Sequence, residues 1–281
     1  MKKISLLLLI NIILFSCTSK LHYGGGNNDL MKQNLTGTVK STYERYYELT
    51  SNSGKLDKGN KTSAYGFDTY RLFNKDGFII QKKTFNFDNS PVSTTVYEYE
   101  DENILLKETK YTATENIDKV YIYAYNEKTK LLESQTTYSA FGRVEYIDKY
   151  SYQNGLLTEV ENFDGQNKSI YKWKYEYDKD GNKIKDTWHI NNNITELFYT
   201  YDEESHIIKQ KEINESKNVT TWEFAYDKNE NKIKEVRTYS DGSQAIINII
   251  YEYDKFDNWV VQKVFEEDMP VYVIERTIEY Y

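Results

Sequence analysis

The stretch Tyr171–Ile184, YKWKYEYDKDGNKI, joins a strand pattern directly to a turn pattern. Four aromatic residues stand on alternate positions from 171 to 177, which places their rings on one face of a β-strand. Residues 178–182, DKDGN, then combine Asp, Gly and Asn, which suit the positive-φ positions of tight hairpin turns. The same five residues also resemble the start of a calcium-binding loop, so the stretch has two interpretations.

The hairpin turn is the favoured interpretation because the calcium loop is incomplete. An EF-hand loop needs a bidentate Glu at its twelfth position, and counting from Asp178 that position is His189. In three other copies of the motif the first position is Glu100, Asn126 and Gln153, so no consistent ligand set recurs. The sequence therefore predicts no metal site in this turn.

Tyr177 belongs to a repeat that runs from about residue 36 to the end of the chain. Equivalent positions are Phe73, Tyr99, Tyr125, Tyr152, Tyr201, Tyr226 and Tyr253. Neighbouring members are 24 to 27 residues apart. In each unit an alternating segment ends at this anchor residue, a polar turn follows, and a second alternating segment ends at another turn such as Asp241-Gly242. Each unit is therefore predicted to be one β-hairpin.

The number of units predicts the size of the sheet. Nine intervals separate Tyr47 from Tyr281, which gives roughly 18 strands. Open sheets of more than about 10 strands tend to curl because neighbouring strands twist. We therefore expect an all-β, antiparallel β-hairpin repeat array with units of about 26 residues, arranged as a curled meander sheet or a β-solenoid-like ribbon. We expect no helix after the N-terminal apolar run, and the sequence leaves open whether the array closes on itself.

The motif YEYDKDGNKI resembles the YD repeat of the Rhs/YD-repeat family, Tyr-x-Tyr-Asp-x-x-Gly followed by Asn or Arg. The family Gly falls on Gly77 and Gly181. Other residues stand at the matching positions of the remaining units: Asn103, Thr129, Ser205, Glu230 and Asp257. The resemblance covers nearly the whole repeat region and implies a distant, degenerate version of this β-repeat.

The N-terminus has the features of a sorting signal. Lys2 and Lys3 precede an apolar run, residues 6–15, that is too short to span a bilayer as a helix. Leu14-Phe15-Ser16-Cys17 resembles the lipobox of bacterial lipoproteins, which implies that Cys17 is lipidated and anchors the protein to a membrane. The alternative is a cleaved signal peptide with an incidental Cys. Cys17 is the only cysteine, so disulfides and Cys-based metal sites are excluded.

These features divide the chain into three expected segments. They are a signal peptide at 1–16, the lipidated Cys and a flexible Gly-rich tether at 17–35, and a YD-like repeat domain at 36–281. Residues 18–20 include no acidic residue, which by resemblance to sorted lipoproteins favours the outer membrane of a bacterial envelope. The formal net charge of −8 becomes −10 without Lys2 and Lys3, and this sign argues against nucleic acid as a partner.

The aromatic residues are the candidate contacts for a ligand. Trp173, Trp222, Tyr175 and Tyr177 could form a platform for sugar rings or for apolar groups of a protein partner. Cross-strand stacking is the structural alternative, and it is favoured for the anchor tyrosines.

Catalysis has little support in the sequence. His22, His189 and His206 lack metal-ligand spacing, and neither a nucleophile motif nor a phosphate loop occurs, so we expect no catalytic residue, metal or cofactor. The sequence favours a lipid-anchored envelope protein that binds or scaffolds a glycan or an envelope protein. Two alternatives remain open: a carbohydrate hydrolase with a pair of carboxylates, and an accessory or immunity-like partner of a secreted protein.

Overall fold

The computed structural model describes residues 28–281 except 101–103 and 192. This part of the chain forms one short helix and 19 strands, and every strand pairing is antiparallel. The elements are α1 (Asp29–Lys32), β1 (Val39–Asn52), β2 (Lys55–Lys61), β3 (Asp68–Phe73), β4 (Ile79–Phe85), β5 (Pro91–Glu100), β6 (Ile104–Thr112), β7 (Ile117–Tyr125), β8 (Leu132–Ser139), β9 (Val144–Gln153), β10 (Leu156–Asp164), β11 (Ser169–Tyr177), β12 (Lys183–Ile190), β13 (Asn193–Tyr201), β14 (Ile207–Ile213), β15 (Val219–Tyr226), β16 (Lys232–Thr238), β17 (Gln244–Tyr253), β18 (Trp259–Glu266) and β19 (Met269–Tyr280). Within the described residues, no helix is long and apolar enough to cross a membrane.

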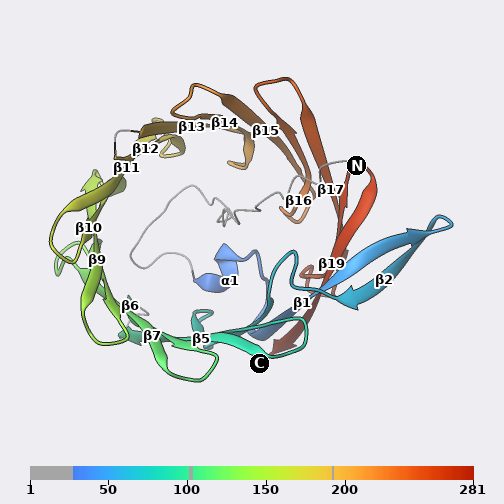
Figure 1. Ribbon diagram of the computed structural model, residues 1–281, viewed down its shortest axis with the longest axis horizontal. Helices are drawn as coiled ribbons and strands as arrows, with labels where there is room; N and C mark the ends of the chain where they lie inside the picture. Colours follow the sequence, from blue (N-terminus) through green and yellow to red (C-terminus); the bar gives the residue numbers. More distant parts are fainter. Residues whose placement is uncertain (1–27, 101–103, 192) are drawn as a thin grey trace.

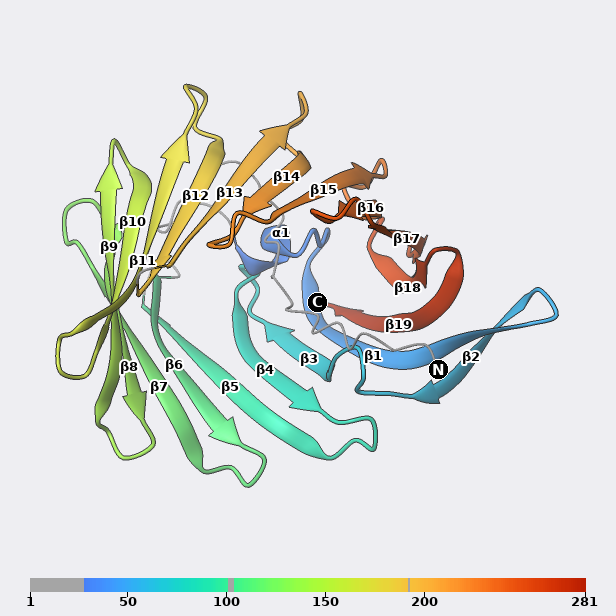
Figure 2. The same ribbon diagram turned by 45° about the horizontal axis from the view of Figure 1, so that its top comes forward.

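The sheet closes on itself. From β3 to β19 each strand pairs with the next, and β1 then pairs with β19 on one side and with β3 on the other. The result is a ring of 18 strands (Figure 1). Strand β2 pairs only with β1, and the β1–β2 hairpin projects from the ring in both views (Figures 1 and 2).

The antiparallel hairpin array predicted from the repeat is confirmed, but both predicted arrangements of it are wrong. The sheet is a closed barrel and neither an open curled meander nor a solenoid-like ribbon. Strand twist brings the last strand back beside the first, and pairing them satisfies two rows of backbone groups that an open sheet would leave unpaired.

The anchor residues face the inside of the barrel. Helix α1 lies within the ring (Figure 1), and its Leu30 packs in a core cluster with Leu35, Val39 and Phe73. Phe73 is an anchor of the repeat, so the residues that share its parity point inward and the alternate residues point outward. Eighteen strands at about 4.8 Å give a circumference of roughly 86 Å. Barrels of this strand number are too wide for wall side chains to fill.

The N-terminal segment corrects two predictions. Residues 28–35 were expected to belong to a flexible tether without helix, yet Asn28 caps α1 and accepts a hydrogen bond from the Met31 amide. The Leu30 amide donates to the carbonyl oxygen of Gly77 at 3.1 Å. Further along, Asn258 donates to the carbonyl oxygen of Thr36 at 2.9 Å. The expected signal peptide (1–16), Cys17 and tether residues 17–27 lie outside the described residues.

A buried ionic triad joins the three strands at which the ring closes. Glu44 on β1 accepts two hydrogen bonds from Arg276 on β19, at 3.0 and 2.8 Å, and lies 3.0 Å from Arg71 on β3. The Arg276 guanidinium also stacks on the Trp259 ring at 3.3 Å. Burial alone would raise the pKa of Glu44, but the two guanidinium groups outweigh burial and hold it at about 2. The triad therefore favours closure in this register.

Candidate binding site on the inner wall

The turn after Tyr177 has the geometry of a hairpin turn, as predicted. The Asp178 carboxylate accepts hydrogen bonds from the backbone amides of Asp180 and Asn182, both at 2.9 Å. Gly181 adopts a φ of +87°, the left-handed conformation that glycine tolerates best. Because Asp178 uses its carboxylate on the turn's own backbone, the Asp-x-Asp-Gly-Asn pattern has a structural explanation.

Other units hold the same left-handed position without glycine. Ser205, Glu230 and Asp257 have φ values of +69°, +61° and +61°. In the β7–β8 turn the left-handed residue is Lys130 and not the predicted Thr129, because that turn is one residue longer. The repeat therefore conserves a backbone conformation more strictly than a residue type.

The hydroxyl groups of several anchor tyrosines have a structural role. Tyr177 donates its hydroxyl to the carbonyl oxygen of Leu157 at 2.7 Å, and Tyr201 donates to that of Lys183 at 2.6 Å. Tyr99, Tyr125 and Tyr226 make the same bond to the preceding hairpin at 2.8 to 2.9 Å. Each of these five anchors thus ties one unit to the one before it, which supports the structural interpretation of Tyr177.

A cluster of aromatic rings lies on the inner wall of β11 and β12. The Tyr171 and Trp173 rings stack with centroids 5.3 Å apart, and Trp173 meets Trp188 across the strands at 6.1 Å. Trp173 and Trp188 are directly paired in the register. Tyr175 lies on the same face, with the ammonium group of Lys183 5.4 Å from its ring centroid.

Polar side chains from β9 and β10 border these rings. Asp148 accepts hydrogen bonds from Asn162 at 2.8 Å and from the Tyr171 hydroxyl at 3.3 Å. Burial and the neighbouring Asp148 raise the pKa of Tyr171 to about 12, so its hydroxyl stays protonated. Trp173 Nε1 and Asn162 Oδ1 have no hydrogen-bond partner among the described residues. We call Asp148, Asn162, Tyr171, Trp173 and Trp188 the inner-wall cluster.

The structure does not bring the other tryptophans to this cluster. Trp222 lies on β15, three strands beyond β12, and the Arg237 guanidinium lies 5.6 Å from its ring centroid. Trp259 packs under Arg276 and is only 9% exposed. Sequence reasoning missed Asp148, although Asp148, Tyr150 and Tyr152 alternate up to an anchor and so share the inward parity.

Two recesses bear on the hydrolase alternative. One, of about 250 Å³ on the inner wall of β4–β7, has Glu108 as its single carboxylate. The other, of about 280 Å³, is lined by Lys172, Lys174 and His189 with neighbouring residues and has no carboxylate. Neither recess holds the pair of carboxylates that glycoside hydrolysis requires.

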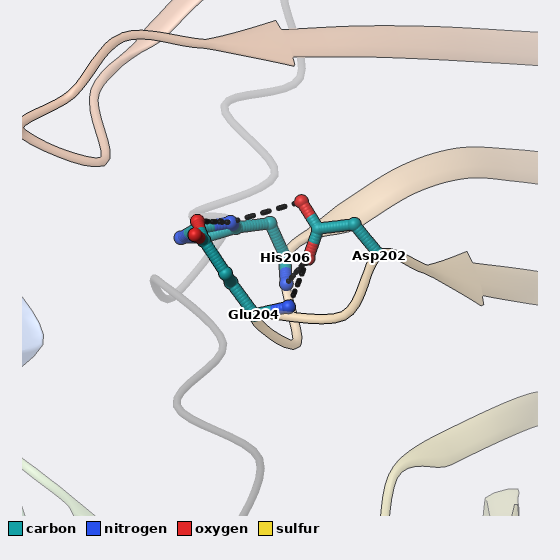
Figure 3. Close-up of side chains that lie close together, drawn as sticks. All are labelled: Asp202, Glu204 and His206. Atoms are coloured by element: carbon teal, nitrogen blue, oxygen red, sulfur yellow. Dashed lines mark hydrogen bonds and ion pairs between the residues drawn. The ribbon is translucent and has the colours of Figure 1, made fainter.

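Asp202, Glu204 and His206 form a compact group in the β13–β14 turn (Figure 3). His206 Nδ1 lies 3.1 Å from Asp202, and its ring stacks on Tyr226 with centroids 5.0 Å apart. The three side chains could offer one ligand atom each to a metal ion. Asp202, however, accepts hydrogen bonds from the backbone amides of Glu204 and His206, the same role that Asp178 has in its own turn. Asp202 is therefore explained by the turn itself, and only the side chains of Glu204 and His206 distinguish this turn from the others.

The outer face of the barrel carries ion pairs between neighbouring strands. Lys172 lies 2.9 Å from Glu159, and the pairs Lys185–Glu196, Lys209–Glu223, Lys263–Glu252 and Lys107–Glu98 span 2.6 to 2.9 Å. All of these residues have the parity opposite to the inward aromatic residues. The outward positions therefore include these charged pairs, while the inward positions hold the aromatic and polar side chains of the inner-wall cluster and also the buried triad of Glu44, Arg71 and Arg276.

No protein-family model matches this chain, and no curated protein matches it in sequence. Among solved structures, it is similar to a porin-like protein from Bacteroides uniformis ATCC 8492, with a TM-score of 0.46 and 11% identity over 87% of this chain and 99% of that chain. A porin-like protein from Bacteroides vulgatus ATCC 8482 has a TM-score of 0.35 and 8% identity over 88% and 99% of the two chains. A chain in the crystal structure of TcdB2-TccC3-Cdc42 has a TM-score of 0.34 and 14% identity, over 70% of this chain and 14% of that one. These TM-scores are too low to assign a function.

Proposed function

We propose that this protein is a lipid-anchored barrel of the bacterial envelope that binds a carbohydrate ligand at the inner-wall cluster. The observation that carries the proposal is the stack of Tyr171 and Trp173 beside Asp148 and Asn162. Aromatic rings pack on the apolar C–H face of a sugar. A carboxylate accepts hydrogen bonds from the sugar hydroxyls, and a side-chain amide both accepts from them and donates to them.

The polar atoms of the cluster are suited to a ligand rich in hydroxyl groups. Trp173 Nε1 can only donate a hydrogen bond and Asn162 Oδ1 can only accept one. Both are buried and lack a partner among the described residues. Leaving such atoms unpaired is costly, so a ligand hydroxyl that pairs with either one adds to binding.

The anchoring part of the proposal rests on the Leu-Phe-Ser-Cys motif at 14–17, and a location at the outer membrane rests on the residues after Cys17. The charged outer face supports a barrel that lies in water beside the membrane. A barrel embedded in lipid presents an outward apolar band, whereas here the outward positions include the lysines and glutamates of the five ion pairs described above. The relation of the hairpin units to the YD repeat is part of the same proposal.

A glycan panel screened with the full-length protein tests the carbohydrate assignment. We expect a reproducible ligand whose affinity falls at least about tenfold in Trp173→Leu. Trp222→Leu is the matched control, since it removes the same ring from the inner face outside the cluster. Loss of binding in Trp222→Leu alone would move the site to β15. A panel without any ligand would contradict carbohydrate binding and leave an envelope protein as the partner to seek.

A further inference from the structure

A second part of the inner wall, formed by β4 to β7, holds the recess of about 250 Å³. Lys82 and Glu108 line it from β4 and β6, and Thr95 and Tyr97 of β5 lie between them. In the register Lys82 pairs with Thr95, and Tyr97 pairs with Glu108. Lys110 of β6 also lines the recess, but it is paired with Asp118 at 3.1 Å. The recess therefore presents two basic side chains and one acidic side chain, and of the two basic ones Lys82 is the one without an ion pair among the described residues.

Lys82 has no carboxylate partner in the described part of the chain. The neighbouring basic residues are already paired, since Arg71 lies 3.0 Å from Glu44 and Lys110 lies 3.1 Å from Asp118. Burial, and then the charge of Arg71, lower the pKa of Lys82. An unpaired and partly buried ammonium group is costly, and an anionic ligand group would relieve that cost.

Among the residues that the structure describes, the Tyr123 hydroxyl is the one hydrogen-bond partner of Glu108, and it donates to the carboxylate at 2.6 Å. Burial raises the pKa of Glu108. No ion pair within 4.0 Å joins Glu108 to Lys82, although each lies close enough to influence the pKa of the other. Lys82 and Glu108 therefore line the same recess with opposite charges but form no ion pair with each other.

We propose that this recess binds a small zwitterion, of the chemical class of free α-amino acids. The ammonium group of Lys82 receives the ligand carboxylate, and the carboxylate of Glu108 receives the ligand ammonium. The rings of Tyr97 and Tyr121, which also line the recess, contact the ligand side chain. The proposal goes beyond carbohydrate binding, because the inner-wall cluster lies on β9 to β12.

Selectivity follows from the same arrangement. A ligand that has only a carboxylate would form an ion pair with Lys82 but would place a second negative charge near Glu108. A ligand that has only an ammonium group would form an ion pair with Glu108 but would place a second positive charge near Lys82. Each of these ligands forfeits one charge-assisted hydrogen bond, so both bind more weakly than the zwitterion.

Calorimetric titration of the full-length protein tests the proposal. The probes are the twenty amino acids, with sodium propionate and ethylamine as the two single-charge halves. We expect one-site binding of at least one amino acid, with both halves at least about tenfold weaker. Lys82→Met and Glu108→Gln should each weaken the amino acid at least about tenfold. Lys83→Met, on the outer face of the same strand, should leave it unchanged.

Three results would overturn the proposal. They are no binding of any amino acid at millimolar concentration, propionate binding as tightly as the best amino acid, and amino-acid binding that survives both Lys82→Met and Glu108→Gln. Thermal melting identifies a variant that has unfolded, and the preference of the wild type for amino acids over the two halves is then the deciding result. A blank glycan panel would leave this outcome unaffected, so the two proposals fail separately.

Discussion

Replacement of Glu44 by Gln should lower the free energy of unfolding of the barrel. Glu44 is the anion between the two guanidinium groups of Arg71 and Arg276, at the strands where the ring closes. Gln keeps the size of the side chain and removes its charge. Arg276, which is 8% exposed, would then be a buried cation without a counter-charge. Breaking a buried ion pair from one side typically costs several kcal/mol.

The size of the effect can be worked out from the pKa of Glu44. Its ordinary value of 4.5 falls to about 2 in the folded protein. Each pH unit of that difference corresponds to about 1.4 kcal/mol, so ionised Glu44 contributes about 3 kcal/mol to the free energy of unfolding. The folded-state pKa is the lower one, so this contribution is fully present above pH 4.5 and is lost as the pH falls towards 2.

Urea unfolding of the full-length protein measures this directly at a series of pH values. The free energy of unfolding of Glu44→Gln should be about 3 kcal/mol below that of the wild type at pH 7, and the gap should close between pH 4.5 and 2. Glu275→Gln is the matched control, because its pair with Lys58 is half-exposed and should be worth less than about 1 kcal/mol. A Glu44→Gln loss below about 1 kcal/mol, or one that stays constant with pH, would refute the reasoning.

Three further predictions concern single residues. Cys17→Ala should release the protein from the membrane fraction into the soluble fraction, and retention in washed membranes would contradict the lipid anchor. Tyr177→Phe should lower the free energy of unfolding by about 1 kcal/mol in urea, since it removes the hydroxyl bond to the Leu157 carbonyl. Glu230→Gly should raise the melting temperature, because glycine adopts a φ of +61° without strain, and the expected gain is roughly 0.5–1 kcal/mol. Gly181→Ala should lower the melting temperature for the same reason. Melting temperatures that shift in the same direction in both variants would argue against conformational strain.

The local features of the fold could be predicted because each is encoded within about 26 residues. Alternation of Tyr171, Trp173, Tyr175 and Tyr177 gives the strand and its aromatic face, and the Asp178 turn gives the hairpin. Repetition of this unit then gives the antiparallel order and the approximate strand number. The side of the sheet that becomes the interior follows only once the ring is closed.

Closure itself could not be predicted, since it depends on pairing between residues more than 200 positions apart. Glu44 and Arg276 lie on strands whose sequences resemble the others, and nothing local marks them as partners. The alternating pattern places Trp173 on one face with the neighbouring aromatic residues, whereas its proximity to Asn162 depends on the register between β10 and β11. Lys82 and Glu108 stand out only after their neighbours Arg71 and Lys110 are seen to be paired.

The single seam between β1 and β19 has a consequence for how the barrel assembles. All other pairings except that of β1 with β3 join strands that are consecutive in sequence, so they can form early as local hairpins. The ring can close only when β19 is available to meet β1. Until then the sheet has two free hydrogen-bonding edges of complementary register, and the β19 edge of one molecule could pair with the β1 edge of another. At high protein concentration the refolding chain should therefore partition between closed monomers and head-to-tail polymers.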